Sequence, residues 1–324
     1  MEPLITVRDL AKRFDKVTAL DGLDFDVHEG ELFGFLGPNG AGKTTTINIL
    51  TGLARPDRGT VHIAGIDCSG DAGAAQHLMG IVPDESNLYP ELTGFENLCF
   101  CGALYGMPRA SRRKRARELL DTFALADAAD RKFAGYSRGM KRRLTIAAGV
   151  MHSPSILFLD EPTTGIDVTG ARQIRKLIAD LNASGTTVFL TTHYIEEAER
   201  LCRRVAFIVG GRIVRADTVA DLMQPVQGRH VLDFTLTGDT TGIESDFRSA
   251  FPEAESVELH DDNLRVTSRE TVHIGPMVHF FEEHGLEIGE ARKIRPTLEE
   301  IFVRITGVAS AAMKREKEKK GGGR

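Results

Sequence analysis

Short apolar segments alternate with longer segments of helical periodicity through most of the first 223 residues. Two of these segments, Ser155–Leu159 and Thr186–Leu190, are largely continuous in their hydrophobicity instead of apolar at every second position. Such a pattern is typical of strands that are buried on both faces, as in a parallel sheet. Helical periodicity is expected at Thr45–Leu50, Gly94–Phe123 and Ala171–Asn182. The order of these elements predicts an α/β fold.

Other segments alternate between apolar and polar residues, which is typical of strands with one exposed face. These are Leu4–Val7, Leu23–Val27 and Thr60–Ala64, followed by a short apolar strand at Met79–Val82 and a hairpin at Arg204–Ala216. The hairpin is expected to turn at Gly210-Gly211.

The last third of the chain has a different order of elements, which begins after a segment with linker composition, Gln224–Gly228. Its pattern is strand, helix, strand, strand, helix, strand, which predicts a ferredoxin-like α+β domain. A further helix is expected at Thr297–Ile305. We therefore assign residues 1–223 to a first domain, 224–228 to a linker, 229–307 to an accessory domain and 308–324 to a charged, disordered tail.

The composition of the 324 residues is that of an ordinary globular protein, with 41% hydrophobic and 27% charged residues. The net charge of −5 argues against bulk attraction to nucleic acid or anionic lipid. We expect the four cysteines to be reduced thiols in a cytosolic protein, and we expect neither a signal peptide nor a membrane-spanning segment. The basic run Arg109–Arg117 is interpreted as a solvated helix face, with partner docking as the alternative.

The chemistry is concentrated first in Gly37–Thr44, which matches the phosphate-loop pattern G-x-x-x-x-G-K-[ST]. Glycines allow successive backbone N–H groups to face phosphate oxygens, and a following helix adds the positive end of its dipole. Lys43 can reach the β- and γ-phosphates of ATP, while the Thr44 hydroxyl can ligate Mg²⁺. The residues assigned to nucleotide contacts are Gly37, Asn39, Gly40, Ala41, Gly42, Lys43, Thr44 and Thr45. A simple glycine-rich turn is the disfavoured alternative.

Carboxylates and a histidine follow the two buried strands, where α/β proteins keep their ligands. Asp160 is placed to hold Mg²⁺, and Glu161 can orient or deprotonate the attacking water. His193 is placed to sense the γ-phosphate, with a structural histidine as the alternative. Phe14 is either an adenine-stacking ring or a core residue.

In their order along the chain these motifs resemble the nucleotide-binding subunit of an ABC transporter. Asp160 and Glu161 match the Walker B motif, 164–167 the D-loop, His193 the switch histidine, and Tyr136–Met140 the LSGGQ signature. The resemblance implies a P-loop NTPase fold with a mixed sheet, an antiparallel β subdomain and an inserted helical subdomain at about residues 88–152. It also implies a head-to-tail homodimer, in which Ser137 and Gly139 contact the ATP of the second copy.

Two residues depart from the family pattern. Arg138 replaces a signature glycine, and Asp84 replaces the Q-loop glutamine. Asp84 keeps an oxygen for Mg²⁺ or water but lacks an amide donor. For Arg138 we expect either a solvent-facing side chain, which is favoured, or a cation near the partner's γ-phosphate.

Two further segments, Leu88–Leu98 and Pro296–Phe302, resemble the drug- and antibiotic-exporting ABC ATPases of the daunorubicin-resistance type. This resemblance implies an ATPase that powers export with a separate integral membrane permease, and thus sits on the inner face of the cell membrane. A regulatory module that hydrolyses ATP poorly and a soluble ABC protein of translation or DNA repair are the competing functions. The single cassette and the lack of coiled-coil heptads disfavour the latter, and no nucleic-acid partner is expected.

Overall fold

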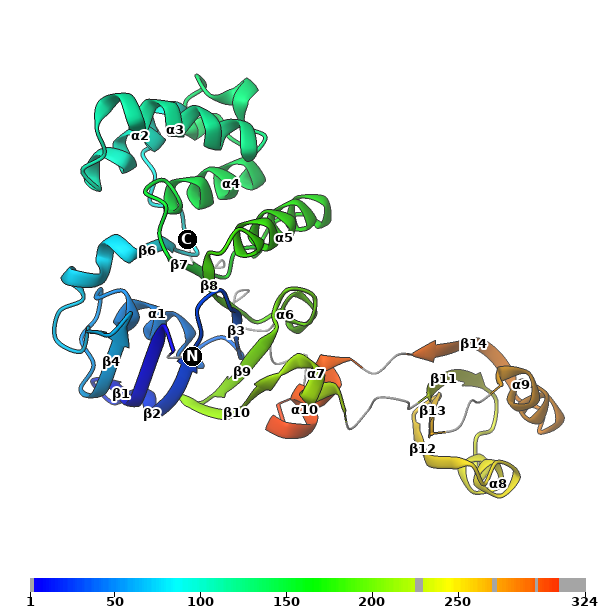
Figure 1. The fold of residues 1–324 in the computed structure, drawn as a ribbon. Helices are drawn as coiled ribbons and strands as arrows, with labels where there is room; N and C mark the ends of the chain where they lie inside the picture. The colour runs from blue at the N-terminus through cyan, green and yellow to red at the C-terminus, as the bar shows by residue number, and fades with distance from the viewer. Residues whose placement is uncertain (1–2, 225–229, 270–272, 295–296, 309–324) are drawn as a thin grey trace. The chain divides into compact units, whose positions relative to one another are not determined.

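The computed structural model describes residues 3–224, 230–269, 273–294 and 297–308 (Figure 1). Apart from Gln224 and Val308, the predicted linker and tail lie outside the described residues. The chain divides into two compact units, one formed by residues up to Val219 together with the chain from Phe302, the other by Ala220–Ile301.

A six-stranded mixed sheet forms the centre of the first unit, in the order β10-β9-β3-β8-β7-β6. Its strands are β3 (Leu32–Leu36), β6 (Met79–Val82), β7 (Ile156–Asp160), β8 (Thr187–Thr192), β9 (Arg204–Val209) and β10 (Arg212–Thr218). Neighbouring strands are parallel except for β10, which pairs with β9 as an antiparallel hairpin. Every residue of β3, β7 and β8 is buried, so the continuous hydrophobic pattern correctly indicated burial on both faces.

An antiparallel sheet of order β2-β1-β4-β5 packs on the same core. Its strands are β1 (Ile5–Phe14), β2 (Val17–Val27), β4 (Arg58–Ile63) and β5 (Ile66–Asp67). The first two are longer than the sequence analysis expected, because they continue into a tight hairpin in which Phe14 pairs with Val17. Residues there are mostly exposed on both faces, so hydrophobic alternation could not reveal the strand.

Some helices of the first unit pack on the strands, and three others, from the middle of the sequence, form a separate group. They are α1 (Lys43–Leu50), α2 (Gly94–Leu104), α3 (Arg109–Thr122), α4 (Arg138–Gly149), α5 (Val168–Ala183) and α6 (Ile195–Leu201), with 3₁₀ turns η1 (Gly73–Leu78), η2 (Ala126–Ala128) and η3 (Phe133–Gly135). After Val219, α7 (Val219–Met223) belongs to the second unit. Helices α2, α3 and α4 pack against one another, as Figure 1 shows. The single helical stretch expected over Gly94–Phe123 is wrong, since Gly106 at φ 71° and Pro108 separate α2 from α3.

The second unit contains an antiparallel sheet of order β12-β13-β11-β14. Its elements are β11 (His230–Thr237), α8 (Ile243–Ala250), β12 (Ala254–His260), β13 (Asn263–Ser268), α9 (Ile274–Glu283) and β14 (Glu287–Ile294). This is the ferredoxin-like order. Its core includes the stacked rings of Phe247 and Phe281, with Phe234 tilted against Phe281.

The last helix, α10 (Leu298–Thr306), does not belong wholly to the second unit. Phe302 is fully buried and packs edge-on against Phe207 of β9, with ring centroids 5.1 Å apart. The second unit therefore ends at Ile301, before the boundary at residue 307 that the sequence analysis assigned.

Two sequence expectations concern the whole described chain. The described helices include none that is both long and apolar enough to cross a bilayer. The four cysteines are free, with Cys68 and Cys202 buried and Cys99 and Cys101 partly buried. Burial raises the pKa of Cys101 to about 11, which keeps this thiol protonated at neutral pH.

Candidate functional site

The glycine-rich loop joins β3 to α1 at the carboxyl ends of the parallel strands. A Cβ at Gly37 would lie 2.1 Å from the carbonyl oxygen of Ile208, so no larger residue fits there. Gly42 has φ +107°, a backbone conformation that favours glycine, and directly precedes Lys43, the first residue of α1. The unpaired N–H groups and the positive dipole end of α1 therefore lie at the loop.

The remaining loop residues differ in exposure. Asn39 and Thr45 are half-buried, Gly40 is exposed, and Ala41 is buried in the core. The carbonyl of Ala41 accepts a hydrogen bond from the N–H of Gly211 at 3.1 Å, which anchors the loop to the β9–β10 hairpin.

Lys43 is buried, and its ammonium group lies within the curve of the loop. Its Nζ donates to the carbonyl oxygens of Gly37 at 2.8 Å and Pro38 at 3.2 Å. The same nitrogen lies 3.2 Å from Oε1 of Glu161. A positive charge is thus held where the loop can accept phosphate, with all its contacts made to oxygen atoms that an anionic ligand can replace.

Thr44 and Asp160 bring two oxygen ligands together beside the loop. The hydroxyl of Thr44 donates to Oδ2 of Asp160 at 2.8 Å, and the hydroxyl of Thr191 donates to its Oδ1. Burial raises the pKa of Asp160, although both hydroxyl hydrogen bonds oppose that rise. A hydroxyl and a carboxylate at this distance form a donor set that suits Mg²⁺.

Glu161 is the centre of a buried network at the end of β7. Its φ of 49° is unusual for a residue with a side chain, and its N–H donates to the Thr191 carbonyl at 3.1 Å. Its Oε2 lies 2.7 Å from Nδ1 of His193 and accepts from the Thr164 hydroxyl at 3.0 Å. Burial acts to raise the pKa of Glu161, but the hydrogen bond to His193 and the charge of Lys43 outweigh it, so the pKa is lowered and the carboxylate is ionised.

Two further candidate residues are Asp84 and Phe14. The negative charge of Asp84 contributes to raising the pKa of Asp160. Phe14 lies at the end of β1 and is 49% exposed, with the ammonium of Lys12 5.3 Å from its ring centroid. Phe14 is therefore not a core residue, and adenine stacking stays a prediction.

The signature residues lie at the start of α4. Ser137 caps this helix, since its Oγ accepts a hydrogen bond from the N–H of Met140 at 3.3 Å. Around Gly139 there is open space, because a Cβ placed there would have no heavy atom within 4 Å. Arg138 is exposed, yet its Nη1 donates to the carbonyl of Gly165 at 2.9 Å. The side chain is thus exposed to solvent, as the sequence analysis favoured, and it also contacts Gly165; a place near the partner's γ-phosphate stays a prediction.

Comparisons with known proteins agree with this geometry. The model of the ABC transporter family matches residues 20–164. The chain is 35% identical to the linearmycin resistance ATP-binding protein LnrL of Bacillus subtilis (strain 168), covering 94% of this chain and 98% of that protein. It is 36% identical to the daunorubicin/doxorubicin resistance ATP-binding protein DrrA of Streptomyces peucetius, covering 94% and 92%. The chain belongs to the ABC transporter family.

Solved structures extend this result to the fold of the ABC ATPase. An ATP-binding subunit of an ABC transporter aligns with a TM-score of 0.62 and 30% identity, covering 68% of this chain and 92% of that one. An ATP-binding cassette solved as a dimer in a post-hydrolysis state with ADP and Pi aligns with a TM-score of 0.61 and 28% identity, covering 66% and 98%. The predicted enzyme class, an ATPase, and the resemblance to the drug-exporter group are confirmed.

The sequence analysis missed Arg142, which is buried in α4 of this ABC ATPase. Its guanidinium donates to the carbonyls of Asp160 at 2.6 Å, Pro162 at 2.9 Å and Asp84 at 3.2 Å, and also to that of Pro83. One side chain thus ties the signature helix to the end of β7 and to the Asp84 segment. The sequence signal that could have revealed Arg142 is a basic residue at a position of α4 that lies among its apolar residues.

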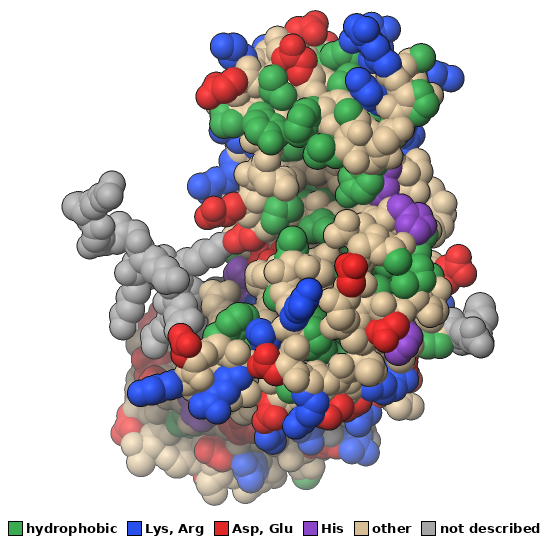
Figure 2. Space-filling view, turned by 90° about the vertical axis from the view of Figure 1, so that its left-hand side faces the viewer, with side chains coloured by type: hydrophobic (Ala, Val, Ile, Leu, Met, Phe, Trp, Pro, Cys, Tyr) green, Lys and Arg blue, Asp and Glu red, His purple; other side chains and the backbone are tan. Residues whose placement is uncertain are grey.

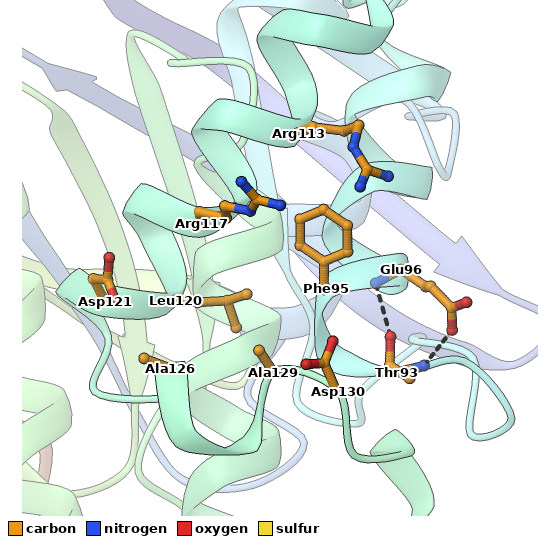
Figure 3. Close-up of a pocket in the computed structure, with 10 residues that line it drawn as sticks. All are labelled: Thr93, Phe95, Glu96, Arg113, Arg117, Leu120, Asp121, Ala126, Ala129 and Asp130. Carbon is orange, nitrogen blue, oxygen red and sulfur yellow. Dashed lines mark hydrogen bonds between the residues drawn. The ribbon is translucent and has the colours of Figure 1, made fainter.

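A pocket of about 510 Å³ in the helical group involves part of the basic run (Figure 3). The guanidinium carbons of Arg113 and Arg117 lie 4.9 Å and 5.8 Å from the ring centroid of Phe95. Other members of the run face Glu118 in ordinary surface pairs. Arg113 and Arg117 are exposed, as expected for a solvated face, and they also cover an aromatic ring, whereas partner docking stays an untested alternative.

Proposed function

We propose that this chain is the ATP-hydrolysing subunit of an exporter, which closes as a head-to-tail dimer on ATP and works with a separate membrane permease. The observation that carries the proposal is the buried network of Lys43, Glu161 and His193 beside the Thr44–Asp160 pair. It combines a phosphate-directed cation, a carboxylate base and a metal-compatible oxygen pair at one end of the parallel sheet.

Each member of the network has a role that follows from its contacts. Lys43 exchanges the carbonyls of Gly37 and Pro38 for β- and γ-phosphate oxygens when ATP binds. Glu161, ionised at neutral pH, accepts the proton of the attacking water. His193 orients Glu161 through the 2.7 Å contact and is placed to sense the γ-phosphate.

The residues beside the loop fit a magnesium ion. The Thr44 hydroxyl and the Asp160 carboxylate would hold it, with Asp84 as a further oxygen donor. When bound, Mg²⁺ neutralises negative charge that develops on the phosphates.

The signature residues fit the ATP of a second copy. Ser137 accepts a hydrogen bond within its own helix, which leaves its hydroxyl proton available as a donor. The first turn of α4 carries no acidic residue, so nothing acidic opposes the positive end of the helix dipole there. This exposed positive end suits a phosphate group of the ATP that the second copy binds.

A membrane partner is supported by the relatives and by the surface. The relatives are named for linearmycin resistance, for daunorubicin/doxorubicin resistance and, in Ralstonia nicotianae, for Nod factor export. Hydrophobic side chains gather over the helical group in Figure 2. In and next to α2, Tyr89, Phe100 and Leu104 are 52%, 38% and 70% exposed. Such a surface fits docking to a permease, which would place the chain at the inner face of the cell membrane.

The Glu161→Gln variant tests the proposal. Without a base, turnover should fall by about 10²- to 10⁴-fold while ATP still binds, so the chain should accumulate as an ATP-bound dimer. Analytical ultracentrifugation with ATP and Mg²⁺, combined with ATPase rates, measures both effects. Glu196→Gln is the matched control, because it makes the same change at an exposed residue of α6, which pairs only with the surface residue Arg200 in the described contacts. A monomeric Glu161→Gln variant with wild-type turnover would refute the assignment, and a wild type without turnover would favour the regulatory module.

A further inference from the structure

Two arginines of α4 hold the loop that follows β7. Arg142 donates to the carbonyls of Asp160 and Pro162, and Arg138 donates to the carbonyl of Gly165. The two arginines are four residues apart and so lie on the same side of the helix. The loop is thereby attached to α4 at two places. The first is at the beginning of the loop, at Asp160 and Pro162, and the second is in the D-loop segment, at Gly165.

The two attachments differ in burial. Arg142 is 7% exposed and bonds to several carbonyls, so it is a fixed anchor. Arg138 is exposed and lies directly on Gly165, where a Cβ would be 2.7 Å from its Nη1. A cation is unfavourable at the N-terminus of a helix, so helix stability does not account for Arg138. The contact with Gly165 does account for it.

The loop also contacts the proposed base. Thr164, adjacent to Gly165, donates its hydroxyl to Oε2 of Glu161 at 3.0 Å. A continuous set of contacts therefore runs from Arg138 through 164–165 to Glu161 and His193.

We propose that Arg138 is a positioning residue that couples the two ATP sites of the dimer, an inference that rests on the proposed function. Ser137 and Gly139, on either side of Arg138, serve the nucleotide of the second copy, while Glu161 serves the chain's own. Closure on the partner's γ-phosphate shifts the start of α4, and Arg138 transmits that shift through Gly165 and Thr164 to Glu161. A glycine at residue 138 has no side chain that could do so.

The test compares steady-state ATP hydrolysis of full-length wild type with Arg138→Met, which keeps length but has no donors, and Arg138→Lys, which restores one. The wild type should show a Hill coefficient clearly above 1, and Arg138→Met a coefficient of about 1 with the half-saturating ATP concentration raised roughly 5-fold or more. Arg138→Lys should recover part of the cooperativity. Arg143→Met is the control, because it makes the same change on the same helix at a residue whose guanidinium donates to the carbonyls of Phe123 and Ala124 instead of to the loop.

The outcomes separate this inference from the proposed function. If ATP does not dimerise the Glu161→Gln chain, both are overturned. If the dimer forms but the Hill coefficient is unchanged by Arg138→Met, or is already about 1 in the wild type, only the coupling is overturned. A fall in kcat of about 100-fold or more at unchanged cooperativity would also overturn it, because that result identifies a cation acting on the γ-phosphate.

Discussion

The phosphate-loop half of the candidate site and the signature half are built in opposite ways. In the first, Lys43, Asp160, Glu161 and His193 are all buried, and their polar atoms contact one another or nearby carbonyls and hydroxyls. In the second, Ser137 is exposed and Gly139 borders open space. The phosphate-loop half is complete within one chain, and we call it the self-contained half. The signature half, which we call the open half, offers donors to a ligand bound by another molecule.

The glycines of the two halves show the same difference. Gly37 must be glycine because a Cβ there would collide with the carbonyl oxygen of Ile208, and Gly42 is favoured as glycine by its positive φ. Gly139 has neither constraint, because nothing in the described chain would meet its Cβ and its φ is not positive. A requirement for glycine at residue 139 would therefore originate in a second copy.

Breaking the self-contained half should produce the largest effect. In Lys43→Ala the β- and γ-phosphates lose their buried cation, so we expect ATP affinity to fall by about 10-fold or more and turnover by about 10²- to 10³-fold. Isothermal titration with ATP and steady-state ATPase assays measure the two changes. Lys176→Ala, on the exposed side of α5, is the control and should behave as wild type. If Lys43→Ala changes neither quantity, this loop is not the active one.

Breaking the open half should reduce turnover without harming the fold. If Gly139 contacts the partner's nucleotide, as we propose, the methyl group added in Gly139→Ala meets that nucleotide, so we expect turnover to fall by about 10-fold or more while the monomer binds ATP normally. The free energy of unfolding should stay unchanged or rise by about 0.5–1 kcal/mol, because alanine is the better helix former.

The control for this variant is Gly275→Ala. Gly275 is likewise the second residue of its helix, α9, and likewise borders open space. It should show no change in turnover, although it should not gain stability in chemical denaturation, because Pro276 disfavours a helical residue with a Cβ directly before it. Equal ATPase rates for both variants would contradict the assignment of Gly139 to the nucleotide of a second copy.

Much of the self-contained half could be predicted because its chemistry is local in sequence. The loop Gly37–Thr44 and the pair Asp160–Glu161 each combine a buried strand with polar residues at its end, and that pattern is visible without a structure. The parallel sheet followed from continuous hydrophobicity, and the second unit followed from the order of its elements.

The rest depended on contacts between segments far apart in the sequence. Arg138 and Gly165 are 27 residues apart, and Arg142 reaches the Asp84 carbonyl across 58 residues, so no periodicity could place them. Phe302 was assigned to the second domain because its helix follows that domain in sequence, whereas burial against Phe207 decides its position.

The smallest predicted effect concerns a buried carboxylate beside the self-contained half. Among the described residues, Glu197 of α6 is 3% exposed, and neither of its carboxylate oxygens has a hydrogen-bond partner of good geometry. Burial raises its pKa above the ordinary value of 4.5, and the nearby hydroxyls of Thr163 and Thr192 offset this only in part. The folded state therefore binds this proton more tightly than the unfolded state, so the contribution of Glu197 to stability rises as pH falls through the raised pKa and decreases above it.

Glu197→Gln keeps the shape of the side chain and removes its charge. We expect its free energy of unfolding at pH 8 to exceed that of wild type by about 1–3 kcal/mol, the usual penalty of an unpartnered buried polar group. The difference should shrink as pH is lowered, because wild-type Glu197 gains its proton as pH falls through the raised pKa. Urea denaturation over a series of pH values measures it, with exposed Glu196→Gln expected to match wild type throughout. A Glu197→Gln variant less stable than wild type at pH 8 would show that the ionised carboxylate is stabilised by Arg175, whose charge acts on it. In that case, Glu197 would belong with the paired charges of the self-contained half.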